Sequence, residues 1–115
     1  GGYGTWMMGK TYPNFFSAMG PVAGGGMSWR AKKLVNTPVM AVHGTADTVV
    51  PPIYSELMVN AINKNGGNAE LILLDGAGHN DGVNNAYLKT DLISWLLKQR
   101  RENFDRVVEP CEEMF

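Results

Sequence analysis

The sequence predicts an α/β fold in which helices cover both faces of a parallel sheet. Apolar runs of strand length alternate with segments of helical spacing along the chain, as in strands joined by crossover helices. Each predicted strand is a continuous apolar run, the pattern of strands that are covered on both faces. Polar, glycine-rich segments follow two of the strands, at the sheet edge where open parallel sheets bind ligands.

The first half of the chain is predicted to hold two helices and two strands. A helix begins at about Thr5 after a glycine-rich turn and stops at Pro13, because proline disfavours helix at the residue before it. Residues 15–23 form an apolar strand that ends in three glycines. Residues 28–35 form a short exposed helix, and residues 39–42 form a compact apolar strand.

The second half repeats this alternation and adds two loops. A polar loop at 43–47 precedes a helix over residues 55–63, and Gly66 is suited to its C-cap. Residues 69–74 form the third strand, residues 75–82 form a polar, glycine-rich loop, and a final helix covers about 84–101. The prediction is therefore three parallel strands and four flanking helices.

Composition and charge exclude several classes of function. The 115 residues fit one small domain, and their net charge of −1 comes without a basic run, so no nucleic-acid partner is expected. The sequence contains no run of about 18 apolar residues, so no membrane span is predicted. With one cysteine and two histidines, the chain has no cluster at metal-ligand spacing and no possible intrachain disulfide, so neither a metal nor a cofactor is predicted.

The last residues differ from the rest in charge. Residues 102–115 hold five acids and one base, a net of −4, which leaves +3 for residues 1–101. This segment is predicted to be an acidic tail, either a helix extension or disordered. No signal peptide is visible, but the chain begins without a methionine, so a leader can precede it and the localisation is left open.

Asp47 and His79 are the candidate catalytic residues. Each lies in a loop that directly follows an apolar strand. Because the carboxyl ends of neighbouring parallel strands meet at one edge of a sheet, a carboxylate and an imidazole from these loops are expected to touch. A serine hydrolase needs such a pair, since the carboxylate orients the histidine that moves the serine's proton.

Four segments resemble the phospholipase/carboxylesterase and predicted-peptidase branch of the α/β-hydrolase superfamily. One of them, residues 21–26, is similar to the end of the strand that precedes the acid-bearing segment. Residues 38–51 are similar to its acid-bearing segment, a strand followed by His-Gly-x-x-Asp and Val-Pro. The pair Gly78-His79 resembles the histidine loop. The opening Gly1-Gly2-Tyr3-Gly4 resembles the residues on the C-terminal side of the serine in a Gly-x-Ser-x-Gly turn. The resemblance covers residues 1–101.

The resemblance implies that this chain is the C-terminal part of a serine esterase or peptidase domain, with the last three strands of a larger sheet. Asp47 and His79 then supply the acid and the base of a Ser-His-Asp triad. The nucleophile would lie two residues before Gly1, so the chain alone is expected to be inactive, and the first strand to have an open edge. That edge is expected to pair with the N-terminal half or with a second copy.

Other residues compete for these roles. Asp81 lies close to His79 in sequence, but two residues along a tight loop rarely give triad geometry; Asp75 is a weaker rival. His43 lies at a strand end and can be read as a ligand or a second base, but it is expected to be structural, as in the His-Gly turn of the family that the sequence resembles, and not catalytic. No serine of the chain lies in a Gly-x-Ser-x-Gly context.

Two other functions are weighed against the hydrolase. A non-catalytic interaction or assembly module with a hydrolase framework is the main alternative, and a nucleophile upstream in the parent protein would distinguish the two. A nucleotide-binding domain is disfavoured because the glycines at the start lack the spacing of a phosphate loop. Small carboxylic esters are the expected substrates by analogy with the family, and peptides remain an alternative.

Overall fold

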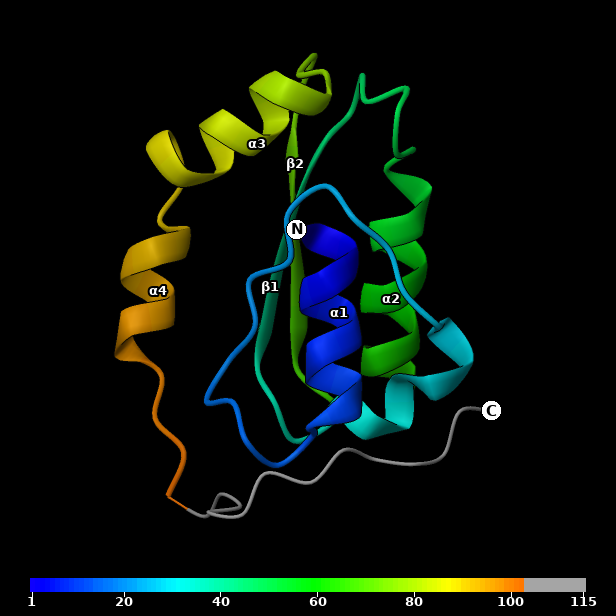
Figure 1. Cartoon of the computed structure of the whole chain (residues 1–115), viewed down its shortest axis with the longest axis vertical. Helices are drawn as coiled ribbons and strands as arrows, with labels where there is room; N and C mark the ends of the chain where they lie inside the picture. Colours follow the sequence, from blue (N-terminus) through cyan, green and yellow to red (C-terminus); the bar gives the residue numbers. More distant parts are fainter. Residues whose placement is uncertain (103–115) are drawn as a thin grey trace.

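The computed structural model describes residues 1–102, in which each strand is followed by a helix, as expected for an α/β fold (Figure 1). The helices and strands, in chain order, are α1 (Gly2–Thr11), the 3-10 helix η1 (Ser28–Leu34), β1 (Val39–Gly44), α2 (Ile53–Lys64), β2 (Ala69–Leu74), α3 (His79–Leu88) and α4 (Leu92–Lys98). Within these residues, no helix is both long enough and apolar enough to cross a membrane.

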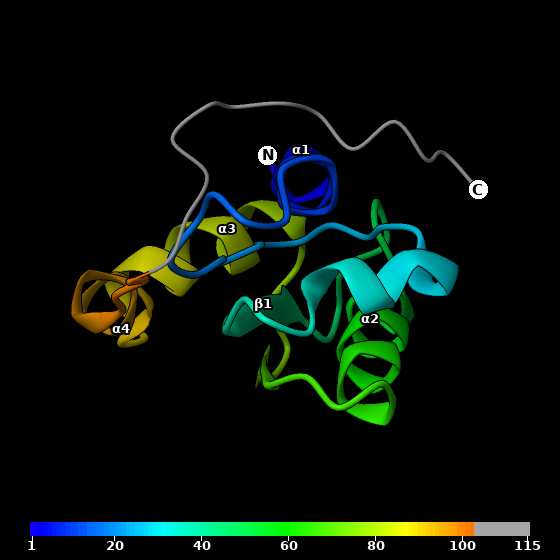
Figure 2. The same ribbon diagram turned by 90° about the horizontal axis from the view of Figure 1, so that it is seen from below.

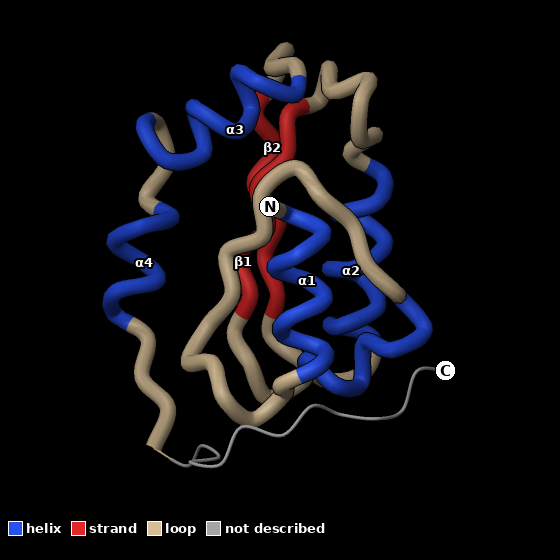
Figure 3. The backbone as a smooth tube through the Cα atoms, in the orientation of Figure 1, coloured by secondary structure: helices blue, strands red, loops and turns tan. Residues whose placement is uncertain are grey.

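The sheet places the ends of β1 and β2 side by side. The two strands are parallel, and their register runs from Val39 opposite Ala69 to Gly44 opposite Leu74. Figure 3 shows both strands running together through the middle of the molecule. The loops that follow them therefore emerge at the same edge, which confirms the parallel α/β class predicted from the sequence.

The predicted first strand is present only as an interrupted segment beside β1. Isolated parallel bridges join Met19 to Val39 and Val22 to Val42. The N–H groups of Met40 and Val42 donate to the carbonyls of Met19 and Pro21, each at 3.0 Å. Proline has no N–H to return a bond to β1, so the ladder is broken in its middle and no regular strand forms.

Each face of the sheet carries its own apolar core. Val39 and Ala41 of β1 pack with α1, η1 and α2, where the buried side chains include Trp6, Leu34 and Ile62. Met40 and Val42 point to the opposite face and pack with the buried side chains Val22, Ala86 and Leu92. Figure 2 shows α2 and α4 on opposite sides of β1 when the molecule is viewed from below. Because alternate residues of β1 enter different cores, both faces of this strand exclude water.

The first helix begins earlier than the sequence analysis predicts. α1 starts at Gly2, not at Thr5, and ends at Thr11, before Pro13. A Cβ at Gly2 would lie 2.3 Å from the carbonyl oxygen of Val22 and 2.6 Å from the amide nitrogen of Gly24. The glycines that the sequence analysis assigns to a turn are thus the first residues of a helix that touches a neighbouring backbone.

The predicted helix over 84–101 is two helices. α3 begins at His79 and ends at Leu88, and α4 covers Leu92–Lys98. Between them, the Oγ1 of Thr90 accepts a hydrogen bond from the N–H of Leu92 at 3.2 Å, so a threonine side chain satisfies the start of α4. The prediction of an acidic tail falls on residues that lie outside the described part of the chain, except for Glu102.

Candidate active site

The loops after β1 and β2 are joined to each other by backbone hydrogen bonds. The N–H of Thr45 donates to the carbonyl of Leu74, and the N–H of Ala46 donates to the carbonyl of Ala77, each at 3.0 Å. The Oγ1 of Thr45 also accepts a bond from the N–H of Gly76 at 2.8 Å. The two loops therefore form one connected rim at the carboxyl end of the sheet.

Gly44 allows the close approach of these loops. A Cβ at this position would lie 2.2 Å from the carbonyl oxygen of Ala77. We expect Gly44→Ala to lower the free energy of unfolding by about 3 kcal/mol, at the upper end of ordinary overpacking. Gly78→Ala is the matched control, because a Cβ there meets no atom within 4 Å. Urea denaturation of both variants tests this prediction, and equal stability of the two would contradict it.

The carboxylate of Asp47 is held by both of its oxygens. Oδ1 accepts hydrogen bonds from the N–H of Val49 at 3.0 Å and the N–H of Val50 at 2.8 Å. Oδ2 lies 2.8 Å from Nδ1 of His79. Asp47 is buried, so these contacts replace the water that a free carboxylate would bind.

The environment of Asp47 favours its ionised form. Burial by itself raises the pKa of this carboxyl. The N–H of Val50, the hydrogen bond and charge of His79, and the N–H of Val49 together outweigh burial, so the pKa of Asp47 lies below its ordinary value. A carboxylate at neutral pH can therefore act as the acceptor for His79.

This lowered pKa makes stability depend on pH. The carboxylate contributes its full stabilisation above about pH 5, and the contribution is lost as the pH falls through the pKa of the folded state. We expect the difference in unfolding free energy between the wild type and Asp47→Asn to shrink from pH 6 to pH 3. The reason is that protonation removes the negative charge that distinguishes aspartate from asparagine. Urea denaturation at both pH values measures it; a difference that stays constant would show that the folded protein does not favour the ionised carboxyl.

One ring nitrogen of His79 contacts Asp47, and the other has no partner among residues 1–102. Because an ionised carboxylate only accepts hydrogen bonds, Nδ1 of His79 carries the proton in the contact with Asp47. No described residue forms a hydrogen bond with Nε2, and the side chain is 32% exposed. His79 opens on a pocket of about 230 Å³, whose other lining residues come from the start of α1, from residues 22–23, from the Asp47 loop and from α3: Gly1, Gly2, Tyr3, Thr5, Val22, Ala23, Val50, Val83 and Tyr87.

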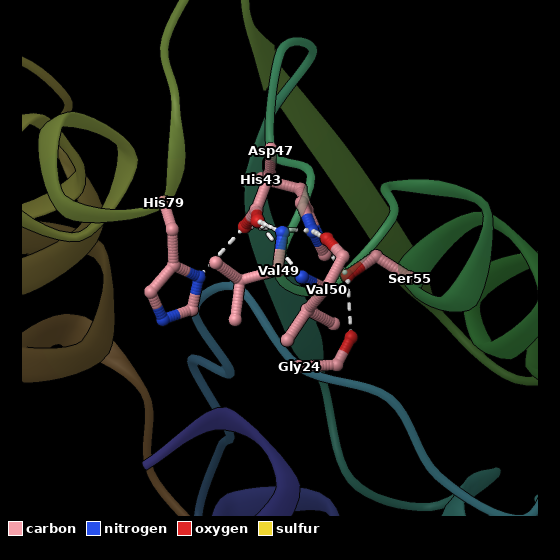
Figure 4. A network of polar contacts seen from close by, with 7 residues as sticks. All are labelled: Gly24, His43, Asp47, Val49, Val50, Ser55 and His79. Atoms are coloured by element: carbon pink, nitrogen blue, oxygen red, sulfur yellow. Dashed lines mark hydrogen bonds and ion pairs between the residues drawn. The ribbon is translucent and has the colours of Figure 1, made fainter.

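A serine and a second histidine lie beside the same aspartate, Asp47 (Figure 4). The Oγ of Ser55 is 2.7 Å from Nδ1 of His43, and Nε2 of His43 is 3.4 Å from Oδ2 of Asp47. However, Ser55 and His43 are both 0% exposed. A shorter contact of 2.6 Å joins Nε2 of His43 to the carbonyl of Val50. No substrate can reach Ser55, so this arrangement is structural.

The competing acids Asp75 and Asp81 make no described contact with His79. Asp75 and Asp81 are exposed. No hydrogen bond joins either of them to His79 within the described residues, and Asp75 instead lies 3.4 Å from the Oγ1 of Thr45. Among residues 1–102, no three histidine, cysteine, aspartate or glutamate side chains are grouped as metal ligands.

Sequence reasoning missed several parts of this site. It did not identify the amides of Val49 and Val50 as partners of Asp47, and it considered Ser55 only among the serines that lack a Gly-x-Ser-x-Gly context. It also placed His79 in a loop, whereas His79 is the first residue of α3. The run Asp-Thr-Val-Val-Pro contained one usable signal, because aspartate often accepts bonds from amides two or three residues later.

The chain is similar to known hydrolases in sequence and in structure. Residues 3–102 match the prolyl oligopeptidase family. A thermostable esterase is 28% identical with a TM-score of 0.81 over 88% of this chain, and esterase PE8 is 25% identical with a TM-score of 0.60 over 78% of it. SOBER1 of Arabidopsis thaliana, at 20% identity and a TM-score of 0.66 over 84% of the chain, supports the fold alone. No curated protein matches the sequence.

These similarities cover only part of each solved structure. The chain spans 29% of the thermostable esterase, 45% of esterase PE8 and 49% of SOBER1. The resemblance to the α/β-hydrolase superfamily, and to a part of its fold, is confirmed. The neighbours also support a hydrolase as the parent protein.

Proposed function

The chain belongs to the prolyl oligopeptidase family, and we propose that it supplies the acid, Asp47, and the base, His79, of the Ser-His-Asp triad of a serine hydrolase. The observation that carries this proposal is the contact of 2.8 Å between Oδ2 of Asp47 and Nδ1 of His79. It leaves Nε2 of His79 without a partner among the described residues and next to a pocket, as a general base requires.

In the proposed reaction, Nε2 of His79 takes the proton of a serine hydroxyl as the serine oxygen attacks an ester or amide carbonyl. Asp47 stabilises the imidazolium that forms. His79 then gives the proton to the leaving alcohol or amine as the acyl-enzyme forms, and the same cycle with water releases the carboxylic acid. No step needs a metal or an organic cofactor.

The start of α1 supports a nucleophile upstream of Gly1. Gly1 and Gly2 line the same pocket as His79, so a residue shortly before Gly1 can reach Nε2. In the resemblance to a Gly-x-Ser-x-Gly turn, Gly1 is the last glycine and the serine precedes it by two residues. The reacting serine and the donors that bind the oxyanion then belong to the longer protein, and the 115-residue chain alone is inactive.

Carboxylic esters are the proposed substrates. Two of the similar solved structures are named as esterases, and the pocket beside His79 is small. The family name also indicates peptides, which the same acyl-transfer chemistry can cleave.

The open edge beside β1 supports a further proposal about partners. The N–H groups of Gly20 and Val22 have no backbone acceptor among the described residues. We propose that a strand of the upstream half pairs there, since unpaired edges invite such pairing. Co-expression of this chain with the upstream half should give a heterodimer in light scattering, and a stable, monodisperse monomer beside an unbound partner would contradict the proposal.

Labelling with an active-site serine phosphonate tests the proposed function. The longer protein should hydrolyse p-nitrophenyl acetate and take up one label, and the 115-residue chain should do neither. A longer protein that is inactive and takes no label would refute the hydrolase and indicate a non-catalytic module with the same framework.

A further inference from the structure

We infer that His43 is a positioning residue for the Asp47–His79 pair. This inference rests on the proposed function for its catalytic meaning, but its structural content is independent of activity. His43 is the residue before the last of β1, on the face covered by α2, and it is fully buried. Figure 4 shows its ring between Asp47 and Ser55, behind the backbone of Val50.

The ring holds Asp47 through Val50. Nε2 of His43 is 2.6 Å from the carbonyl oxygen of Val50, while the N–H of the same residue donates to Oδ1 of Asp47 at 2.8 Å. A carbonyl oxygen can only accept, so Nε2 must carry a proton. Val50 is thus fixed at its carbonyl by His43, and it fixes the carboxylate through its amide.

The same ring also faces the oxygen that binds His79. Nε2 of His43 lies 3.4 Å from Oδ2 of Asp47, and Nδ1 of His79 lies 2.8 Å from that oxygen. The N–H dipole of His43 favours negative charge on Oδ2, because both side chains are buried where the local dielectric is low. Both oxygens of Asp47 therefore depend on where the His43 ring sits.

The other ring nitrogen fixes His43 itself. Nδ1 is 2.7 Å from the Oγ of Ser55 at the start of α2. That Oγ is also 3.2 Å from the carbonyl oxygen of Gly24. In a neutral ring with its proton on Nε2, Nδ1 accepts the hydroxyl proton of Ser55. If that proton points to Gly24 instead, Nδ1 must also carry a proton and the ring is an imidazolium. Nε2 is protonated in both arrangements. The ring is thereby attached to α2 and to the loop that touches α1.

Two substitutions at His43 distinguish the hydrogen bonds of its two ring nitrogens. The side-chain nitrogen of glutamine is as many bonds from Cα as Nε2 of histidine, whereas the nitrogen of asparagine corresponds to Nδ1. His43→Gln can keep the bond to Val50 and lose the one to Ser55. His43→Asn can keep the contact with Ser55 and lose the one to Val50. If His43 positions Asp47, the contact between Asp47 and His79 should be disturbed in His43→Asn, which loses the Nε2 donor, and kept in His43→Gln.

The first measurement is the ¹⁵N spectrum of the imidazole rings in the 115-residue chain, which has only two histidines. We expect a protonated Nε2 on His43 and a protonated Nδ1 on His79. In His43→Asn, His79 should lose its preference for the Nδ1–H tautomer and the pKa of Asp47 should rise, because the Val50 amide is no longer held. In His43→Gln both features should persist.

Several results would overturn the inference. One is an unprotonated Nε2 on His43 in the wild type, since that nitrogen could not then donate to Val50. A second is a folded His43→Asn chain in which His79 keeps its Nδ1–H tautomer. A third is a folded His43→Gln chain in which His79 loses that tautomer. If His43→Asn does not fold, the wild-type ring and His43→Gln decide the outcome, because both report directly on the Nε2 donor.

Kinetics in the longer protein separate this inference from the proposed function. His43→Asn should lower kcat about ten- to hundredfold, the scale expected when a catalytic group is displaced, with KM little changed, and His43→Gln should restore most of kcat. An inactive wild-type protein would refute the proposed function and leave the ring spectra valid. An active protein whose two variants have equal kcat would refute the positioning role alone.

Discussion

Replacing His79 by alanine should lower the kcat of the longer protein for p-nitrophenyl acetate by roughly 10⁴- to 10⁶-fold, the range found when the base of a serine triad is removed. The reason is the position of Nε2, which has no partner among the described residues and lies beside the pocket next to Gly1 and Gly2. Without it, no described group next to that pocket can take the proton of the serine. Steady-state kinetics and phosphonate labelling measure the loss, since both need an activated serine.

Asp81→Asn is the matched control for this variant. Asp81 lies two residues after His79 in the first turn of α3 and is exposed, so its charge is close to the site but not part of the described contacts. We expect its kcat to stay near the wild-type value. A His79→Ala enzyme with wild-type kcat, or an Asp81→Asn enzyme as damaged as His79→Ala, would contradict the assignment of the base.

The contact between Asp47 and His79 could be predicted because it depends on few assumptions. Two apolar runs of strand length, each followed by polar residues, are sufficient to expect parallel neighbours whose loops meet. The structure pairs β1 and β2 in register to their last residues and joins the following loops. The predicted range of β2, residues 69–74, also agrees with the structure.

The start of α1, the interruption of the first strand and the pairing of His43 with Ser55 could not be predicted, because they depend on tertiary contacts that local sequence patterns do not contain. Gly2 lies within α1, and a glycine is required there because the backbone of residues 22–24 passes close to it. Pro21 interrupts an apolar run because its missing N–H faces β1. The pairing of His43 with Ser55 joins two buried side chains from different elements, and nothing in the spacing of these residues reveals that they meet. Positions shaped by close packing and by buried polar pairs are therefore where sequence reasoning fails.

Asp47→Asn should lower kcat about 10⁴-fold with little change in KM, as expected when the acid of a triad loses its charge but keeps its shape. The amides of Val49 and Val50 both point at Oδ1, so the carbonyl oxygen of the new asparagine should take that place. Its NH₂ group then faces Nδ1 of His79 and donates to it. Nδ1 must become an acceptor, which moves the ring proton to Nε2 and leaves no base for the serine.

The tautomer change gives this prediction a readout that does not depend on turnover. In Asp47→Asn, the ¹⁵N spectrum should show Nε2 of His79 protonated, and Asp75→Asn should leave the spectrum and kcat unaltered because Asp75 touches only the Thr45 side of the rim. A slow Asp47→Asn enzyme that kept the Nδ1–H tautomer would mean that Asp47 acts through its charge alone. Wild-type kcat in Asp47→Asn would contradict the assignment of the acid, because Asp47 is the described carboxylate that contacts His79, at 2.8 Å.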